Sequence, residues 1–247
     1  MATLYVIATP IGNLGDMTFR AVETLKTVDL VACEDTRQTL KLLTHFGIRA
    51  RLLSCRAANE ASASRKVIAA LDERKTVAYC SDAGTPAISD PGAILARSAA
   101  SAGHTVVPLP GASAFASLVS VAGISDKTVV FEGFLSPKGG RRKSRLKELL
   151  ETGAAFVLYE SPFRILKLFA DIVDLERERY VCVGREMTKV HEEYLRGSAL
   201  EISAILKEKT ELRGEFAVFV SGHDAKAQTG CKYLPVYADN ESKEVIV

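Results

Sequence analysis

The sequence contains no apolar run that approaches the roughly 20 residues needed for a bilayer-spanning helix. It opens on Met1–Ala8, a short apolar stretch without the basic residues that begin a secretory leader. We therefore expect neither a secreted nor a membrane protein, and we expect the chain to be cytoplasmic.

The chain also lacks a surplus of either charge, because 32 basic residues stand against 30 acidic ones and leave a formal net charge of +2. A general attraction to polyanions is therefore excluded, and any nucleic-acid surface must be local. The five cysteines show no CxxC spacing and are interpreted as reduced, mostly buried thiols. The four histidines show no metal-ligand spacing, so no metal is expected.

What is present is an alternation of short apolar runs with amphipathic segments, which is typical of a parallel α/β architecture. Four apolar runs are predicted to be buried strands: Leu4–Ala8, Leu30–Cys33, Val77–Cys80 and Thr105–Leu109. The segment Asn59–Glu73 is predicted to be a surface helix, because Val67 and Leu71 recur at helical spacing. Glu60 is expected among the charged residues on its wet face.

A second series of elements follows a predicted helix near Ser113–Val121. Its predicted strands are Val129–Phe134, Phe156–Tyr159, Val181–Arg185 and Phe216–Val220, and its predicted helices are Arg145–Leu150, Arg164–Val173 and Ser198–Lys207. Two α/β domains in tandem fit this order best, over residues 1–115 and 116–225, with a hinge within Gly111–Gly123. Residues 226–247 are expected to form a weakly structured tail.

Ligands of open parallel sheets bind outside the carboxyl ends of the strands, so the loops after the first-series strands are the candidate site. The first loop, Thr9–Asp16, does not match G-x-G-x-x-G, and Pro10 lacks the backbone donor that phosphate binding needs. No GxxxxGK[ST] segment occurs either. On composition alone, this loop is equally an ordinary strand-to-helix turn capped by Asp16 or Thr18.

The second loop, Ser81–Gly92, is more specific, because a long run of small residues after a strand leaves backbone groups open to a ligand. At its end, Asp90 before Pro91 predicts the start of a helix. The third loop, Pro110–Ser113, also joins a strand to a helix, with Ser113 as the expected cap.

These loops and several later segments resemble the ribosomal RNA small subunit methyltransferase I family of 16S rRNA cytidine 2′-O-methyltransferases, in the tetrapyrrole methylase superfamily. The resemblance runs in order from the first strand to about Val220. The segments that carry it are Thr9–Asp16, Cys33–Arg37, Ser81–Gly92, Pro110–Ser113, Tyr159–Pro162, Arg185–Lys189 and Gly214–Glu215.

The resemblance implies two α/β domains with S-adenosylmethionine (SAM) in the cleft between them, a homodimer, and methylation of a cytidine 2′-hydroxyl in the decoding region of the small ribosomal subunit. It implies that Gly84, Thr85 and Ile88 surround SAM. The looser neighbours that it implies are Pro10, Asp82, Ser113 and Tyr159.

The chain departs from this family in two places. Phe163 stands before Arg164 where the family usually has a histidine, so a polar contact from that side chain is absent. Members also commonly continue into a further helical region, whereas this sequence ends at Val247.

Methyl transfer to a hydroxyl needs an aligned oxygen and a place for its proton. A pocket of small residues with few cations suits a sulfonium donor, whose charge is dispersed in the transition state. Glu160 and Glu186 are the candidate bases, because each follows a second-series strand. The alternative is that both form structural ion pairs with nearby cations, and it is favoured over direct catalysis.

A local basic run, Lys138–Lys147, carries six basic residues and no acid, which indicates an RNA surface rather than a solvated helix face. Phe131 and Phe134, just before it, are expected in the core rather than as base-stacking platforms. The residues proposed to contact RNA are Arg37, Lys138, Arg141, Arg142, Lys143, Arg164, Arg185 and Lys189. For Arg37, a surface pair with its acidic neighbours is an equal alternative.

Two other functions remain open from the residues. The same fold class methylates porphyrin and corrin rings, although the basic run argues against a macrocycle. A non-catalytic RNA-binding or assembly protein could also keep a SAM-like pocket. Methyl transfer to RNA would separate that protein from an enzyme.

Overall fold

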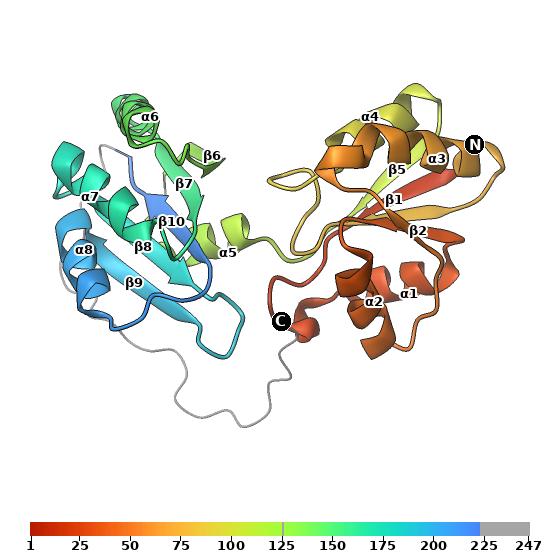
Figure 1. Cartoon of the computed structure of the whole chain (residues 1–247), viewed down its shortest axis with the longest axis horizontal. Helices are drawn as coiled ribbons and strands as arrows, with labels where there is room; N and C mark the ends of the chain where they lie inside the picture. The colour runs from red at the N-terminus through yellow and green to blue at the C-terminus, as the bar shows by residue number, and fades with distance from the viewer. Residues whose placement is uncertain (125, 223–247) are drawn as a thin grey trace. The chain divides into compact units, whose positions relative to one another are not determined.

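The computed structural model describes residues 1–124 and 126–222. The chain divides into two compact units, one from Met1 to Ser113 and one that begins at Ala114, and each has its own sheet (Figure 1). The expected tail at residues 226–247, with Cys231, lies outside the described residues.

The first unit is built on a parallel sheet with the strand order β3-β2-β4-β1-β5. Four of the strands lie where the apolar runs predict them, and the parallel arrangement is confirmed. The short edge strand β3 was missed because it has three half-buried residues. The strands are β1 (Thr3–Ile7), β2 (Leu30–Cys33), β3 (Leu52–Ser54), β4 (Val77–Cys80) and β5 (Thr105–Leu109).

Helices cover both faces of this sheet (Figure 1). Successive residues of a strand point to opposite faces of the sheet. Val31 therefore packs with one pair of helices, and Ala32 packs with a second pair on the opposite face. The first pair is α1 (Phe19–Thr27), after the short 3-10 helix η1 (Leu14–Asp16), and α2 (Thr36–His45). The second pair is α3 (Glu60–Asp72), after η2 (Ala57–Asn59), and α4 (Ala93–Ser101). Thr18 caps α1, as one of the two expected candidates, by accepting from Ala21 N at 3.2 Å.

Two expectations about this unit are wrong, and they share one cause. Helix α4 begins at Ala93 with Gly92 as its N-cap, rather than at the Asp90–Pro91 pair. Glu60 is only 6% exposed and does not lie on a wet face. Its carboxylate reaches from α3 to the start of α4, where Oε1 accepts from the backbone N–H of Gly92 at 2.9 Å. The same oxygen accepts from the two following N–H donors, at residues 94 and 95.

The second unit has a mixed sheet with the order β6-β7-β10-β8-β9, in which β6 and β7 are parallel and the remaining pairs are antiparallel. Strand β9 was not predicted; the other four were. The strands are β6 (Val129–Phe134), β7 (Ala155–Glu160), β8 (Tyr180–Arg185), β9 (Glu193–Ser198) and β10 (Phe216–Val220).

Three helices cover one face of the second sheet, and α5 packs against the other (Figure 1). Helix α6 begins at Gly139, earlier than the predicted Arg145, and α5 begins directly after Ser113 as expected. The helices are α5 (Ala114–Val121), α6 (Gly139–Glu151), α7 (Ile165–Glu176) and α8 (Ala199–Glu208). Among the helices of residues 1–124 and 126–222, none combines the length and apolar character needed to cross a membrane.

The cysteines in the described part of the chain are free and buried, which confirms the interpretation of reduced thiols for those four. Burial raises the pKa of Cys55 to about 11 and also raises the pKa of Cys80. Neither thiol is therefore a nucleophile at neutral pH.

Candidate functional site

The loops after β1 and β4 are joined by a short antiparallel bridge in the first unit. Thr9 N donates to the Gly84 carbonyl at 2.9 Å, and Gly84 N donates to the Thr9 carbonyl at 3.0 Å. The helices that follow these two strands pack on opposite faces of the sheet, so this is its topological switch point. The resemblance places the cofactor at this position.

Side-chain hydrogen bonds also connect the Ser81–Gly92 loop to the loops after β5 and β2. The Thr85 hydroxyl donates to the Ala112 carbonyl at 3.1 Å, which links the second loop to the third. Asp82 Oδ1 accepts from Asp35 N at 2.9 Å, which links the second loop to the end of β2. The structure therefore brings Asp82, Gly84 and Thr85 together with the loops that carry Pro10 and Ser113.

The backbone of the second loop takes two conformations that favour glycine. Gly84 has φ +78°, and a Cβ there would lie 3.3 Å from Ile11 Cγ2. Ala87 has φ +65°, although it is not glycine. Non-glycine residues held at positive φ cluster at ligand-binding sites. Ile88 follows with 43% of its surface exposed, so the loop offers an apolar side chain beside its backbone groups.

Carboxylates give this edge of the sheet a negative field. Burial raises the pKa of Glu34, and the nearby charges of Asp82 and Asp90 raise it further. Hydrogen bonds from Arg37 lower the pKa of Asp35 to about 2. The Arg37 side chain itself is 86% exposed and pairs with Asp35 at 2.6 Å. An edge with this charge is suited to a positively charged ligand.

Tyr159 and the two candidate bases belong to the second unit. Glu160, the last residue of β7, is buried and forms an ion pair with Arg164 at 2.7 Å. Its Oε1 also accepts from Ser161 N at 2.8 Å. This arrangement supports the ion-pair alternative for Glu160.

Glu186 lies in a tight turn after β8 and is similarly engaged. Its Oε1 accepts from Lys189 Nζ and from Glu215 N, both at 2.9 Å. The side chain lies over Gly214, where a Cβ would come within 2.3 Å of it. Burial lowers the pKa of Lys189, but hydrogen bonds and charges from Glu186 and Glu215 outweigh burial and raise it overall. The side chain of Glu186 therefore joins the turn after β8 to the segment before β10.

The turn after β8 is also strained, because Glu186 and Thr188 have φ +49° and +67°. Next to it, Arg185 lies 3.5 Å from Glu193 and donates through Nε to the Arg213 carbonyl at 2.8 Å. Lys209 pairs with the same glutamate at 2.7 Å. Sequence reasoning missed Glu193 because β9, which carries it, was not predicted.

The basic run at the start of α6 divides into paired and unpaired cations. Arg142 is 6% exposed, and its Nε donates to Asp171 at 2.7 Å. Lys143 pairs with Asp174. Lys138 and Arg141 are exposed, and neither has an ion-pair partner among residues 1–124 and 126–222. These two cations remain available to an external anion.

Phe134 does not lie in the core, contrary to expectation, because 57% of its surface is exposed. Phe131 is half-buried and packs edge-on against Tyr159, with ring centroids 5.0 Å apart. Tyr159, one of the residues expected near SAM, is thus in contact with two phenylalanines of β6.

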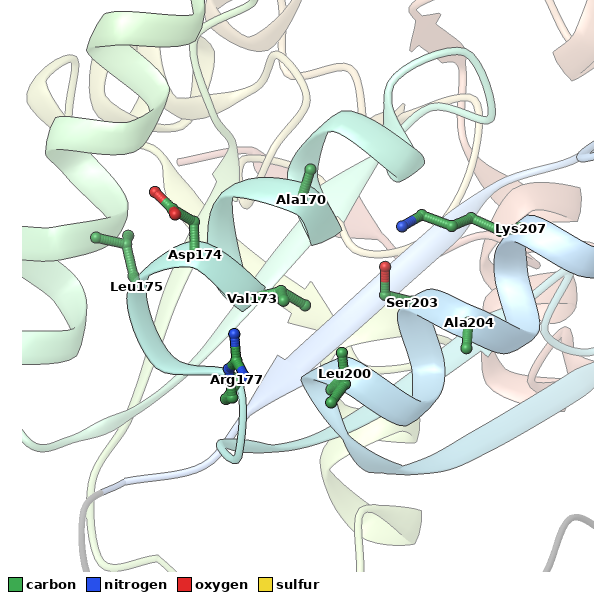
Figure 2. Close-up of a pocket in the computed structure, with 9 residues that line it drawn as sticks. All are labelled: Ala170, Val173, Asp174, Leu175, Arg177, Leu200, Ser203, Ala204 and Lys207. Carbon is green, nitrogen blue, oxygen red and sulfur yellow. The ribbon is translucent and has the colours of Figure 1, made fainter.

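A groove of about 490 Å³ lies between α7 and α8, and Asp174, the partner of Lys143, is one of its lining residues (Figure 2). Ala170, Val173 and Leu200 line it, with Lys207 at one end. None of the residues predicted to bind SAM or RNA takes part in it. In the part of the chain that the structure describes, no three histidine, cysteine or carboxylate side chains are grouped to hold a metal.

Known proteins are similar to this chain over most of its length. Residues 3–203 match the family model described as Tetrapyrrole (Corrin/Porphyrin) Methylases. A ribosomal RNA small subunit methyltransferase I from Borrelia garinii is 45% identical, over 88% of this chain and 98% of the relative. Proteins of the same name from Escherichia coli O157:H7 and Bacillus subtilis are 43% and 40% identical, over 91% and 90% of this chain and 79% and 76% of theirs.

Solved structures of two methyltransferases share the fold at low sequence identity. Uroporphyrin-III C-methyltransferase from Thermus thermophilus has a TM-score of 0.61 and 15% identity, covering 90% of this chain and 94% of its own. Cobalt precorrin-4 methyltransferase has a TM-score of 0.62 and 15% identity, covering 89% and 94%. These similarities support the architecture and do not identify the acceptor.

Proposed function

This chain belongs to the tetrapyrrole methylase family, whose members are SAM-dependent methyltransferases, and on that premise we propose that its acceptor is ribosomal RNA. The proposed reaction is methylation of the 2′-hydroxyl of a cytidine in the decoding region of the small subunit. The observation that carries this proposal is the 40–45% identity to proteins named for that RNA over most of the chain. The similarity to porphyrin and corrin methyltransferases, at 15% identity, supports the fold alone.

The loops at the carboxyl edge of the first sheet fit SAM. When bound, SAM supplies an electrophilic methyl group on a positively charged sulfur. Asp82 and Glu34 set a negative field suited to that cation, and Ile88 offers an exposed apolar surface. Gly84 and Thr85 hold the loop in shape through Thr9 and Ala112. We assign SAM to these loops, with Pro10 and Ser113 at its margins, and we propose Tyr159 of the second unit as a further neighbour of SAM.

Proton removal from the acceptor is assigned to the second unit. Glu160 and Glu186 remain the candidate bases. Each forms an ion pair, with Arg164 and Lys189 respectively, and that pair would have to break before the carboxylate could accept a proton. Glutamine replacements test them: loss of the acidic limb of the pH–rate profile, on which the rate rises as the carboxyl group loses its proton, indicates a base if folding is intact. A uniform fall in kcat accompanied by lower stability indicates the ion-pair role instead.

RNA phosphates are proposed to meet the second unit at the start of α6. Lys138 and Arg141 are exposed there and their charges are not neutralised by acids of the described chain. Arg142 and Lys143, which pair with acids on α7, are assigned a smaller share. Further contacts are proposed for Arg37, Arg164, Arg185 and Lys189, each of which would exchange a carboxylate partner for a phosphate.

The domain boundary is proposed at residue 115, two residues after Ser113, where the first compact unit ends. A homodimer is proposed on the resemblance alone, and light scattering at micromolar concentration tests it. A cytoplasmic location follows from the proposed substrate, because ribosomal subunits are assembled in that compartment.

The deciding experiment is transfer of labelled methyl from SAM to small subunits from a strain without this modification. We expect one labelled nucleotide, whose 3′ linkage resists alkali because its 2′-oxygen is blocked. Naked small-subunit RNA and assembly intermediates are tried in parallel. Absence of transfer to all three substrates, from protein that binds SAM, would refute the RNA acceptor.

A further inference from the structure

Four aromatic rings form a continuous file on the α5-facing side of the second sheet. The ring centroids are 5.4 Å apart between Phe115 and Phe131, 5.0 Å between Phe131 and Tyr159, and 5.8 Å between Tyr159 and Phe134. All three contacts are edge-to-face, with interplanar angles of 71°, 67° and 70°, the arrangement that aromatic pairs prefer. The file ends at Phe134, the last residue of β6.

A β-bulge puts two phenylalanines of one strand against one tyrosine. Residues three apart in a regular strand point to opposite faces, so Phe131 and Phe134 could not both contact Tyr159 without a register shift. The pairing of β6 with β7 shifts between Phe131 and Gly133, and Gly133 has φ +72° there. Phe134 then pairs with Tyr159 in the ladder, so its ring is held from one side.

The other side of Phe134 is open. With 57% of its surface exposed, this ring is fixed by its neighbour and presents apolar surface to solvent. A lone exposed phenylalanine needs no explanation, but Phe134 packs on Tyr159, which is itself packed on Phe131, so less ordering entropy is lost when a partner binds to its open side.

The chemistry around Phe134 is cationic. The segment from Phe134 to Arg141 contains Lys138 and Arg141, both exposed, and no acidic residue. Glu132, the nearest acid before it, is neutralised by Arg145 at 2.8 Å. A flat aromatic surface flanked by free cations matches one kind of partner best, which is an unpaired base with its flanking phosphates.

We propose that Phe134 is a stacking platform for an unpaired base of the acceptor RNA, with Lys138 and Arg141 on the adjacent phosphates. The proposal rests on the proposed function and adds what it lacks, which is a way to recognise single-stranded RNA. Unpaired bases can be splayed out onto aromatic side chains, whereas bases within an A-form helix cannot. A stacked base would also hold its strand in place while a ribose hydroxyl is methylated.

The test uses the full chain and a 12-nucleotide single-stranded RNA of decoding-region sequence, read by fluorescence anisotropy. Phe134→Ala should weaken RNA binding about 5- to 100-fold, because stacking on an aromatic side chain is lost. Phe134→Leu keeps apolar surface without a π-face and should lose nearly as much, whereas Phe134→Tyr should restore binding. Phe19→Ala, which removes a 94% exposed phenylalanine from the first unit, is the matched control and should bind as the wild type does.

The stacked base itself is found by replacing one nucleotide at a time with an abasic one. At one position the difference between wild type and Phe134→Ala should disappear, because there is no base left to stack. SAM affinity, measured by calorimetry, should stay within about twofold in Phe134→Leu and Phe134→Tyr, which keep an apolar side chain beside Tyr159. Duplex RNA of the same sequence should not distinguish the variants.

The outcomes separate this proposal from the proposed function. Equal RNA affinity of wild type and Phe134→Ala overturns the platform and leaves methylation standing. A fall in SAM affinity with unchanged RNA affinity assigns Phe134 to the cofactor site and also overturns the platform. RNA binding that depends on Phe134, without methyl transfer to any substrate, supports the platform and refutes the acceptor assignment. If the wild type binds none of these RNAs, the platform is refuted, and methyl transfer to subunits decides the acceptor separately.

Discussion

Removing Glu60 should destabilise the first unit far more than removing an ordinary helix glutamate. One oxygen of this buried carboxylate accepts the N–H groups of Gly92, Ile94 and Leu95, at 2.9, 2.9 and 3.2 Å. Gly92 is the N-cap residue of α4 and has no side chain with which to cap it. Glu60 is therefore a cap supplied from another helix.

The size of the effect follows from these contacts. Loss of an N-cap costs about 0.5–2 kcal/mol. A buried donor left without an acceptor costs about 1–3 kcal/mol more. Glu60→Ala should thus lower the free energy of unfolding by about 3 kcal/mol. Glu60→Gln keeps an acceptor oxygen but loses the favourable charge at a helix N-terminus, so about 0.5–1 kcal/mol is expected.

Urea denaturation measures the loss, and native-state hydrogen exchange locates it at the amides of Ile94 and Leu95. Glu23→Ala is the matched control, because the Glu23 side chain is 69% exposed and pairs with Lys26 on the same helix. That variant should cost less than about 0.5 kcal/mol. Since Gly92 also ends the loop that begins at Ser81, Glu60→Ala should weaken SAM binding as well. Equal stability of the Glu60 and Glu23 variants would refute the capping role. Unchanged SAM affinity of Glu60→Ala would show that the shape of the Ser81–Gly92 loop does not affect SAM binding.

Further predictions follow from the same contacts. The double replacement Lys138→Gln/Arg141→Gln should reduce the salt slope of single-stranded RNA binding by about 1.4, as expected for two lost phosphate contacts, whereas Lys26→Gln/Lys75→Gln should leave it unchanged. Gly84→Ala should lower SAM affinity measured by calorimetry, because φ is +78° and its Cβ would crowd Ile11 at 3.3 Å; Gly103→Ala, at φ +81° with no neighbour within 4 Å, controls for backbone strain alone. Arg37→Ala should raise the pKa of Asp35 from about 2 toward the ordinary 3.8 in a carboxyl NMR titration, so that the stabilisation that the wild type has above pH 3.8, and loses as the pH falls toward 2, becomes smaller. Alkylation at pH 8 should spare Cys33, Cys55, Cys80 and Cys182 in the native protein and label them in urea, and rapid native labelling of any of them would contradict their burial.

Much of the candidate cofactor site could be predicted from the sequence because it is local. The run of small residues from Ser81 to Gly92 follows an apolar strand directly, and both features are visible in the order of residues. Strand β4 forms where its apolar run predicts it. The site reaches its final shape through contacts that no local pattern encodes, such as the bridge between Thr9 and Gly84, which lie 75 positions apart.

The candidate acceptor surface was harder to predict, because charge in a sequence does not indicate exposure. Arg142 and Arg141 are adjacent in the basic run, yet one is buried against Asp171 and the other is exposed. Helical geometry separates them, since neighbours on a helix are about 100° apart and point in different directions. Residue type predicts Phe134 in the core for a related reason: a phenylalanine in a strand is usually buried, and the only sign of the bulge that turns it outward is the single glycine before it, Gly133.

The sequence by itself determined most of the strands and helices, the parallel arrangement of the first sheet, the loops at its edge, and the resemblance that implies their chemistry. These depend on hydrophobic period and on residues near one another in the chain. Only the tertiary structure decided that Glu60 caps a helix that begins some 30 residues away, that Glu186 clamps the turn before Glu215, and that an aromatic file ends in an open ring. Those outcomes depend on which distant segments pack together, because burial and partner atoms, rather than residue type, set what a charged or aromatic side chain can do.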